Sequence, residues 1–464
     1  MTALDIVILA AGKGTRMKSR VPKVLHRLAG QPLLAHVLDA AAALQARNVV
    51  VVTGHGAGQV ESFCATRAAP APRTVLQEPQ SGTGHAVQQA MPWLPDDGVV
   101  LILNGDVPLV EPDTLRQLVA LADRDTLALL TVDTGEDAGG YGRIVRAPDG
   151  AVRAIVEARD ADDRQRALTE WYSGVMAAPA RRLARYLARL TDDNAQRELY
   201  LTDVVRHAVA DDARIAALTI ADTAQVAGVN SPAQLAALER VVQARRAAAL
   251  MDAGVRLADP ARIDVRGELR CGQDVEIDVG CVFEGQVTLA DDVSVGAHCV
   301  IANARVEAGA VIHPFTHIDG GQPGVTIGPG ARVGPYARLR PGAWLGAHVH
   351  VGNFVEVKNS RLADGAKANH LAYLGDAEVG ARANYGAGSI TANYDGVHKH
   401  RTVIGADVHV GSNCVLVAPV TIGAGGTVGA GSVITKNTPP GALSVARGWQ
   451  IVKTDWADPA KAKP

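Results

Sequence analysis

The sequence of 464 residues is poor in aromatic side chains and in cysteine. Phe, Trp and Tyr together make up 4% of it, and the five cysteines are scattered without a C-x-x-C pair. An odd number of isolated cysteines does not indicate a disulfide framework, so we expect small core residues in a reducing compartment. A formal net charge of -2 also excludes a general attraction to nucleic acid or to anionic membranes.

Long apolar runs are missing as well. No run approaches the roughly 20 residues that a membrane-spanning helix needs, and the apolar run at residues 6–11 follows an aspartate and is too short for a signal peptide. We therefore predict a cytoplasmic protein of two or three domains, with neither nucleic acid nor a membrane as partner.

Glycine is abundant instead, with 48 residues concentrated in the second half. In that half an aliphatic residue recurs at every sixth position, at Ile327, Val333, Leu339, Leu345, Val351 and Val357, again from Ile404 to Ile434, and more weakly from Ile263. Six is neither the helical nor the alternating strand period. Such a period predicts stacked units in a parallel β-helix with three short strands per coil, and it disfavours a Gly/Val-rich β-sandwich, which has no fixed repeat.

The first half begins with a buried strand at residues 5–9, followed by the loop Gly12-Lys13-Gly14-Thr15-Arg16 and by Lys23. A strand, a glycine loop and a helix together present backbone N–H groups to phosphate. The spacing fits neither a Walker loop nor a dinucleotide fingerprint. Several cations around a flexible loop predict binding of a nucleotide triphosphate.

Further strands are predicted at residues 49–53, 75–76 and 99–103, alternating with helical stretches such as 32–46 and 114–122. This alternation indicates a largely parallel sheet with ligands at the carboxyl ends of its strands. Two polar stretches follow predicted strands, residues 77–85 and Asn104-Gly105-Asp106. Asp106 at a strand tip is a natural magnesium ligand beside phosphate, or alternatively a turn residue.

The two halves are joined by an Ala-, Leu- and Arg-rich stretch, residues 232–255, which predicts a long helix with Ser231 as its N-cap. The hexapeptide pattern is interrupted at residues 320–324, a plain loop, and at residues 388–401, a long polar insertion of the kind that carries function in solenoids. From Thr438 the sequence no longer repeats, and we expect this tail to pack over the β-helix or to be partly disordered.

Around the second interruption lie the polar residues Arg340, Lys358, His370, Tyr373, Asn384 and Lys399. Acyl transfer to an amine needs a base, and histidine titrates closest to neutral pH, so His370 is the best candidate. A lone histidine is often structural, but the stretch around His370 breaks the hexad rhythm. Glu356 is our candidate for orienting this base.

Five motifs carry a resemblance, at residues 9–17 (LAAGKGTRM), 22–26 (PKVLH), 82–86 (GTGHA), 105–109 (GDVPL) and 140–144 (GYGRI). They resemble the sugar-nucleotide pyrophosphorylases. Together with the hexapeptide half, the whole chain resembles the bacterial bifunctional N-acetylglucosamine-1-phosphate uridyltransferase / glucosamine-1-phosphate acetyltransferases. The resemblance implies acetyl transfer from acetyl-CoA to glucosamine 1-phosphate, then uridylyl transfer from UTP, for peptidoglycan and lipopolysaccharide synthesis.

The same resemblance implies an α/β fold. It consists of a Rossmann-like nucleotidyltransferase domain (residues 1–231), a linker helix (232–254) and a left-handed parallel β-helix with a C-terminal tail (255–464), assembled as a homotrimer with acetyl sites between subunits. Catalytic roles fall to His370 and Arg16, and magnesium to Asp106 and Asn230.

The binding residues implied by the resemblance form three groups. UTP and the amino sugar would be bound by Leu9, Ala10, Ala11, Gly12, Lys23, Gln77, Gly82, Thr83, Asn104, Gly105, Asp106, Gly142, Glu157, Tyr172 and Asn230. Glucosamine phosphate would be bound by Arg340, Lys358, Tyr373 and Asn384. Acetyl-CoA would be bound by Ala387, Asn393, Tyr394, Ser412, Ala430 and Arg447.

Three positions depart from the common family pattern. Asn104 stands where a tyrosine often precedes Gly-Asp, Tyr172 stands where the sugar site usually has asparagine, and Ala392 replaces a frequent cysteine. The first two departures change the side chains offered to the sugar nucleotide. The third argues against an essential thiol.

Two other functions compete with the bifunctional enzyme. The β-helix could be a noncatalytic assembly module, but a scaffold would not need His370 and the cations on its repeats. Alternatively, the H-x-H pairs at residues 348–350 and 398–400 could indicate a zinc enzyme resembling the hexapeptide-repeat carbonic anhydrases. Zinc would need three imidazoles converging on one point.

Overall fold

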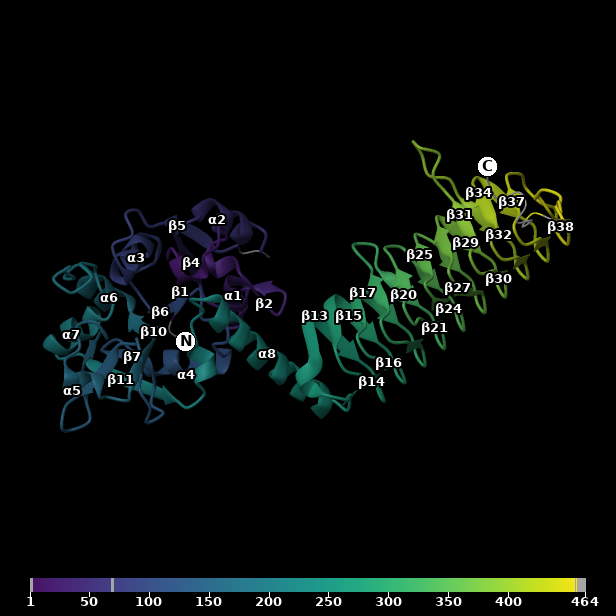
Figure 1. Ribbon diagram of the computed structural model, residues 1–464. Coiled ribbons are helices and arrows are strands. Elements are labelled where there is room, and N and C mark those ends of the chain that lie inside the picture. Colours follow the sequence, from purple (N-terminus) through teal and green to yellow (C-terminus); the bar gives the residue numbers. More distant parts are fainter. Residues whose placement is uncertain (1–2, 68–70, 455, 457–464) are drawn as a thin grey trace, which may run out of the picture. The chain divides into compact units, whose positions relative to one another are not determined.

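The computed structural model describes residues 3–67, 71–454 and 456. The chain forms two compact units, residues 1–242 and 243–464 (Figure 1). The helix α8 (Pro232–Asp252) contains the boundary between them, and the hydroxyl of Ser231 accepts a hydrogen bond from the Gln234 N–H (3.3 Å), as expected of an N-cap. The predicted limits of the linker helix, residues 232 and 254, stay a prediction.

The first unit is built on a nine-stranded sheet with the main order β11-β7-β10-β6-β1-β4-β5. Its strands are β1 (Leu4–Leu9), β4 (Asn48–Thr53), β5 (Arg73–Leu76), β6 (Val99–Asn104), β7 (Thr126–Val132), β8 (Arg143–Arg146), β9 (Val152–Val156), β10 (Trp171–Pro179) and β11 (Arg214–Ile220). Strands β1, β4, β5 and β6 are parallel, as predicted, whereas β10 runs antiparallel to β6 and β7. The sheet is therefore mixed.

Helices cover both faces of this sheet. They are α1 (Leu33–Ala42), α2 (Ala57–Ala65), α3 (Thr83–Ala90), α4 (Pro112–Leu121), α5 (Asp163–Arg166), α6 (Ala180–Leu187) and α7 (Asp203–Ala210). Side chains alternate along a strand, so Ile6 and Ile8 pack with α1, α2 and α4, while Val7 packs with α3, α6 and α7. Burial on both faces explains why the central strands are continuous apolar runs.

The second unit is a parallel β-helix, which confirms the reading of the hexapeptide period and excludes the β-sandwich. Most strands one coil apart pair residues 17 or 18 positions apart. The separation is 17 for Arg361 and Glu378, and it is 18 for Val333 with Val351 and for Leu339 with Val357. These aliphatic side chains are fully buried. Three consecutive hexads make one coil, so each aliphatic row stacks on itself inside the prism.

Three faces enclose this core. The first consists of β12 (Arg256–Leu257), β14 (Glu276–Ile277), β16 (Ser294–Val295), β18 (Val311–Ile312), β21 (Arg332–Val333), β24 (His350–Asn353), β27 (Lys367–His370), β30 (Asn384–Tyr385), β33 (His409–Val410), β36 (Thr427–Val428) and β38 (Leu443–Ser444). The second consists of β20 (Val325–Ile327), β23 (Trp344–Leu345), β26 (Arg361–Leu362), β29 (Ala377–Val379), β32 (Thr402–Ile404) and β35 (Val420–Ile422).

The third face consists of β19 (His317–Asp319), β22 (Arg338–Leu339), β25 (Glu356–Lys358), β28 (Tyr373–Gly375), β31 (Ile390–Ala392), β34 (Val415–Val417) and β37 (Val433–Ile434). The long strands β13 (Ile263–Cys271), β15 (Cys281–Leu289) and β17 (Val300–Val306) precede it. Strand β17 pairs with β19 and with β20, and so joins the second and third faces.

Two coils are longer than the rest, at the predicted interruptions. Val306 pairs with Ile327 across the first, and Tyr385 pairs with Val410 across the second. The second insertion follows β31 and leaves the prism as a projecting loop in which Tyr394 and Lys399 are bridged (Figure 1). The ladder on either side of each insertion continues in register.

Two expectations need correction or qualification. The tail does not leave the ladder at Thr438, because β38 adds another strand to the first face by pairing with β36; residues 455 and 457–464 lie outside the described part. All five cysteines are free, and four are buried, while Cys271 is only half-buried. Burial raises the pKa of the Cys271 thiol to about 11.

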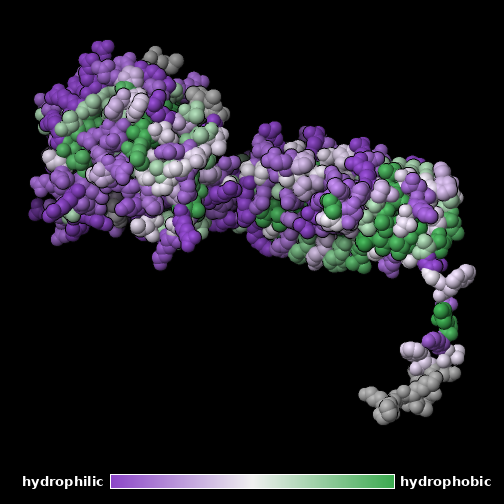
Figure 2. All heavy atoms as spheres, turned by 90° about the horizontal axis from the view of Figure 1, so that it is seen from above, coloured by the Kyte–Doolittle hydropathy of each residue, from purple (hydrophilic) through white to green (hydrophobic). Residues whose placement is uncertain are grey.

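One corner of the prism, between the first and third faces, carries exposed apolar side chains. His298, Phe315, Tyr336 and Phe354 occupy successive coils with their rings stacked at centroid distances of 5.2, 5.0 and 5.4 Å. Leu371 continues the row with 61% exposure. Apolar atoms also reach the surface of this unit in Figure 2. We call the row from His298 to Leu371 the corner ladder.

The buried hexad side chains make a direct prediction about stability. Leu339→Ala removes a fully buried side chain and should lower the free energy of unfolding of the β-helix by about 2–5 kcal/mol, because the neighbouring coils cannot close the cavity. Urea unfolding of the full chain measures this. Arg332→Ala, at an exposed position, is the control; equal losses in both variants would contradict the assignment of the core.

Candidate functional sites

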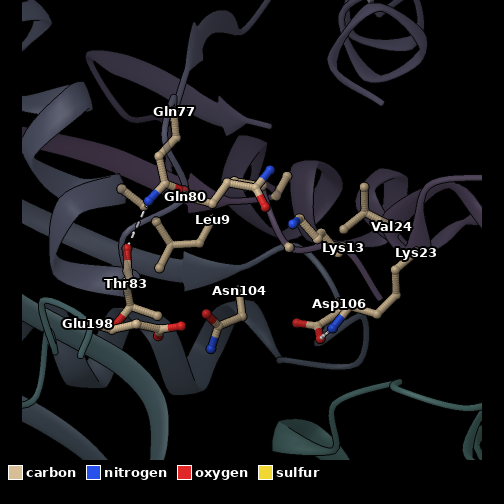
Figure 3. A pocket seen from close by; sticks show the side chains of 15 residues that line it. Leu9, Lys13, Lys23, Val24, Gln77, Gln80, Thr83, Asn104, Asp106 and Glu198 are labelled. Carbon is tan, nitrogen blue, oxygen red and sulfur yellow. Dashed lines mark hydrogen bonds and ion pairs between the residues drawn. The ribbon is translucent and has the colours of Figure 1, made fainter. Parts of the chain in front are cut away.

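The first unit contains a cavity of about 460 Å³ at the carboxyl ends of its strands. Its lining residues are Leu9, Ala10, Ala11, Gly12, Lys13, Lys23, Val24, Gln77, Gln80, Gly82, Thr83, Ala86, Asn104, Asp106 and Glu198. Strands β1 and β6 pair Leu9 with Asn104, so the glycine loop and the Asn104–Asp106 stretch leave the sheet side by side. Figure 3 shows these side chains around the cavity.

The glycine loop shapes one wall of this cavity. Gly14 has a positive φ of 57°, and a Cβ atom there would lie 2.8 Å from the Cβ of Lys23. Only glycine suits both that backbone conformation and that close approach. The loop thus packs against the aliphatic stem of Lys23, and the ammonium is held toward Asp106.

Lys23 connects the loop to the two predicted metal ligands. Its ammonium donates to Oδ2 of Asp106 and, at 2.9 Å, to Oδ1 of Asn230 (Figure 3 shows Lys23 and Asp106). The Lys23 and Asp106 side chains are only 14% and 17% exposed. Two oxygen atoms from distant parts of the chain therefore converge on one cation.

The opposite wall is formed by the stretch that we expect to read the base. The Gln77 amide donates to the Gly82 carbonyl (2.9 Å), and the Thr83 hydroxyl accepts from the Leu201 N–H (3.1 Å). Gly82 has a φ of 100° and packs against the Leu199 backbone. These contacts fix the loop before α3 and leave its remaining polar groups facing the cavity.

The predicted sugar residues lie beside a second cavity of about 180 Å³, lined by Glu157, Tyr200 and Thr202 among others. Glu157 accepts a hydrogen bond from the Thr202 hydroxyl (3.0 Å), and burial raises its pKa above the ordinary value. Gly142 is adjacent, since a Cβ there would lie 3.8 Å from the Glu157 carboxyl carbon.

The two departures in this unit lie on the neighbouring strands β6 and β10 but have different surroundings. The Asn104 amide donates to the Gly174 carbonyl (3.3 Å), and a Cβ on Gly174 would lie 2.2 Å from that amide nitrogen. Tyr172 is buried, its hydroxyl has no hydrogen-bond partner, and burial raises its pKa. Asn104 thus faces the larger cavity, whereas Tyr172 packs in the core.

Some predicted residues lie off the cavity lining, and some lining residues were missed. Arg16 is exposed on the 3₁₀ turn Thr15–Met17 and is not a lining residue. Gly105 is not a lining residue either, but its N–H donates to the carbonyl of the lining residue Leu9 (2.9 Å). Gln80 and Glu198 line the cavity without having been singled out. Glu198 follows no strand and no motif, so sequence offered no signal for it.

In the second unit, His370 lies at the end of β27 on the first face. Its Nδ1 is 2.7 Å from Oδ1 of Asn353, one coil away. The guess that Glu356 orients this histidine was wrong, because Glu356 accepts from Arg338 (3.4 Å) and from Arg340 (2.8 Å). An Asn353 oxygen that accepts from Nδ1–H leaves the exposed Nε2 as the acceptor, which is the tautomer a base requires.

A column of small residues continues from His370 along the first face. Lys367, Asn384, His409 and Thr427 are register partners in successive coils. The residues three positions later are His370, Ala387, Ser412 and Ala430, which therefore form a parallel column. Arg447 donates to the Ala430 carbonyl (2.8 Å). The predicted acetyl-CoA residues Ala387, Ser412 and Ala430 thus lie in one column with the candidate base, and the Arg447 guanidinium reaches its far end.

Cations gather on the third face. Arg340 and Lys358 hold equivalent positions in neighbouring coils, because each lies two residues after one of the register partners Arg338 and Glu356. In the next coil the register partner of Lys358 is Gly375. The Lys399 ammonium, from the insertion, lies against Lys358 and lowers the pKa of that lysine. Like charges held together in this way form a site for an anion.

Of the remaining predicted residues, Tyr373 and Asn393 lie near this cation group, whereas Asn384 lies on the first face. Gly375 follows Lys358 in the same column, and a Cβ there would lie 2.3 Å from the Tyr373 hydroxyl and 2.8 Å from the Asn393 amide. Asn393 donates to the carboxylate of Asp376 (2.5 Å). Tyr394 is exposed in the insertion, and the half-buried Asn384 pairs with His409 (3.2 Å) on the first face.

Within the described residues, no group of three or more His, Cys, Asp or Glu side chains is placed to hold a metal ion. His400 of the second H-x-H pair instead pairs with Asp395 (2.6 Å), which lowers the pKa of that carboxyl. In the part of the chain that the structure describes, the two H-x-H pairs thus do not supply three converging imidazoles. Across the same residues, no helix is both long and apolar enough to span a membrane.

Known proteins match both units. Residues 6–207 match the MobA-like NTP transferase domain, and residues 324–359 and 401–436 match the bacterial transferase hexapeptide family (six repeats). The chain is 69% identical to the bifunctional protein GlmU of Paracidovorax citrulli (strain AAC00-1) and 66% identical to that of Acidovorax sp. (strain JS42), with 99% of each chain covered. The chain belongs to the GlmU family.

Membership of the GlmU family confirms the bifunctional enzyme predicted from the sequence, with a nucleotidyltransferase half and a hexapeptide acyltransferase half. It also sets aside the noncatalytic scaffold. The GlmU protein of Aromatoleum aromaticum (strain DSM 19018 / LMG 30748 / EbN1), 53% identical over 99% of both chains, shares the name at greater distance.

The raised pKa of Glu157 predicts a stability effect. A carboxyl whose pKa is higher in the folded chain stabilises it below the ordinary pKa, and this contribution is lost as pH rises through the raised value. Glu157→Gln keeps an acceptor for Thr202 without the buried charge, so its Tm should exceed that of the wild type at pH 7.5 and converge with it near pH 4. Calorimetry from pH 4 to 8 measures this, with the exposed Glu136→Gln as control. A lower Tm for Glu157→Gln at pH 7.5 would contradict the assignment.

Proposed function

We propose that the first unit transfers a uridylyl group from UTP to N-acetylglucosamine 1-phosphate. The observation that carries this half is the convergence of the glycine loop, Lys23 and Asp106 on one cavity large enough for a nucleotide. A phosphate oxygen of the sugar attacks the α-phosphorus, the bond to the β-phosphate oxygen breaks, and pyrophosphate leaves. Alignment and cations suffice for such a step, and little covalent chemistry is needed from the protein.

Each group of predicted residues in the first unit then has a role. The backbone of residues 9–12 and the Lys23 ammonium bind the phosphates, and Gln77, Gly82 and Thr83 read the uracil edge. Arg16, whose guanidinium fork matches phosphate geometry, meets the charge that develops on pyrophosphate. Gly142, Glu157 and the backbone at Tyr172 bind the amino sugar.

Asp106 and Asn230 would hold Mg²⁺ together with phosphate oxygens of the substrate. The site fits a cation, because the oxygens of these two residues already converge on the Lys23 ammonium. When bound, the ion neutralises charge on the transferring phosphates. A site with one carboxylate and one amide suits magnesium, which usually completes its shell with phosphate and water.

For the second unit we assign acetyl transfer from acetyl-CoA to glucosamine 1-phosphate. Nε2 of His370 removes one proton from the sugar ammonium, and the resulting amine attacks the thioester carbonyl. The C–S bond then breaks, the second proton on nitrogen passes to the departing sulfur, and the products are the amide and the CoA thiol. Arg340, Lys358 and Lys399 bind the sugar phosphate, with Tyr373 and Asn384 beside them. The thioester arm lies along Ala387, Ser412 and Ala430, where short side chains leave a groove, and Asn393, Tyr394 and Arg447 flank it.

We further propose that the chain assembles as a homotrimer through the corner ladder. Phe315, Tyr336 and Phe354 are between 47% and 56% exposed, which is unusual for a row of large rings. The ladder separates the His370 column from the Arg340 column. Another copy of the chain that covers it would close the acetyl site, which is otherwise open to solvent on this corner.

Separate sites predict separable activities. His370→Ala should lower the rate of acetyl transfer about 10²–10⁴-fold, the usual contribution of a general base, and leave uridylyl transfer intact. Asp106→Ala should do the reverse. Both rates are measured on the full chain by release of free CoA and of pyrophosphate. Equal loss of both activities in either variant would refute two independent sites.

The corner ladder predicts a link between assembly and one activity. Tyr336→Glu places a charge in the apolar row and should convert the trimer to monomers, with loss of acetyl transfer and unchanged uridylyl transfer. Light scattering after size exclusion measures the mass. Thr421→Glu, exposed on the second face, is the matched control and should remain trimeric. A trimeric, active Tyr336→Glu variant would rule out the ladder as the interface.

A further inference from the structure

The ammonium of Lys23 occupies the point on which the two proposed metal ligands converge. It donates to Oδ2 of Asp106 and to Oδ1 of Asn230 at the same time. A divalent ion bound to both oxygens would have to stand where Nζ now stands. Lys23 and a metal ion therefore exclude each other from this position.

The stem of Lys23 lies close to the glycine loop. Pro22 precedes the short turn Lys23–Leu25, and a Cβ atom on Gly14 would lie 2.8 Å from the Cβ of Lys23 and 3.4 Å from its Cγ and Cδ. Lys23 also lines the cavity beside Gly12 and Lys13, where the proposed phosphates bind. Rotation about the terminal side-chain bonds of Lys23 would move its ammonium from the Asp106 carboxylate to a nucleotide phosphate.

Charge balance sets the order of events. A largely buried carboxylate is costly without a counter-charge, and Lys23 supplies that charge to Asp106 while no substrate is bound. If a metal ion replaced Lys23 with no nucleotide present, two cations would face each other without phosphate between them. A triphosphate removes this repulsion because it offers Lys23 new anionic partners.

We propose that Lys23 closes the metal site of the nucleotide-free protein, and that nucleotide phosphates open it by taking the ammonium over. Metal affinity is thereby coupled to nucleotide binding, and the coupling is reciprocal. This inference rests on the proposed uridylyl transfer site and adds the regulation of its metal. It assigns Lys23 a second role besides phosphate binding.

The test is binding of Mn²⁺ alone, without nucleotide, to the full chain, followed by the electron paramagnetic resonance of the free ion. Lys23→Met should bind Mn²⁺ at least about tenfold more tightly than the wild type, the change expected when one competing ion pair is removed. Lys23→Gln, which keeps a hydrogen-bond donor without the charge, should fall between them and guards against a folding defect in Lys23→Met.

Two further variants identify the site. Asp106→Ala in the Lys23→Met background should abolish the added affinity, and Lys18→Met, an exposed lysine outside the cavity, should leave Mn²⁺ binding unchanged. Asp106-dependent binding that is equally tight in the wild type and in both Lys23 variants would overturn the gate but keep the metal site. A tightening that survives Asp106→Ala would also overturn it. The rate of uridylyl transfer by the wild type tests the underlying function separately.

Discussion

Hydrogen bonding between coils is the constraint on which the second unit depends. Each strand pairs only with the strand one coil before and one coil after it, so every aliphatic side chain stacks on its own equivalent. This arrangement makes the prism tolerant of insertions at its corners, because a longer connection leaves the ladder on either side in register. The insertion after β31 uses that tolerance to bring Lys399 against Lys358.

The first unit solves a different problem, the burial of charge. The parallel strands β1 and β6 end at one edge of the sheet, which brings the glycine loop and Asp106 together. Asn230 lies far along the chain and joins them through the segment before α8, where the Val229 N–H donates to the Asp106 carbonyl (3.0 Å). An ion pair compensates the carboxylate at this edge. The oxygens that pair with Lys23 are the ones proposed to bind a metal cation, so stability and the proposed function share one set of contacts.

The coils of the second unit and the central strands of the first could be predicted from the sequence, for physical reasons. The hexad period specifies the coil and its buried row, and the apolar runs before the glycine loop and before Asn104 specify the central strands. Strands β7, β10 and β11 were not anticipated, since short Ala- and Leu-rich runs fit a buried helix equally well. Asn353 was also missed, because it acts through His370 in the next coil, and Glu198 was missed because it follows no strand and no motif.

The column from His370 to Ala430 has a fixed spacing. Successive coils lie about 4.8 Å apart, as neighbouring strands do in any sheet, and His370, Ala387, Ser412 and Ala430 lie in four successive coils. An extended arm laid along this column would span roughly 14 Å between His370 and Ala430, which lie three coils apart. In the proposed acetyl site, the distance from His370 to a group that binds the far end of an acyl carrier is therefore a whole number of coils. Adding or deleting one coil would shift the acceptable length by a single step.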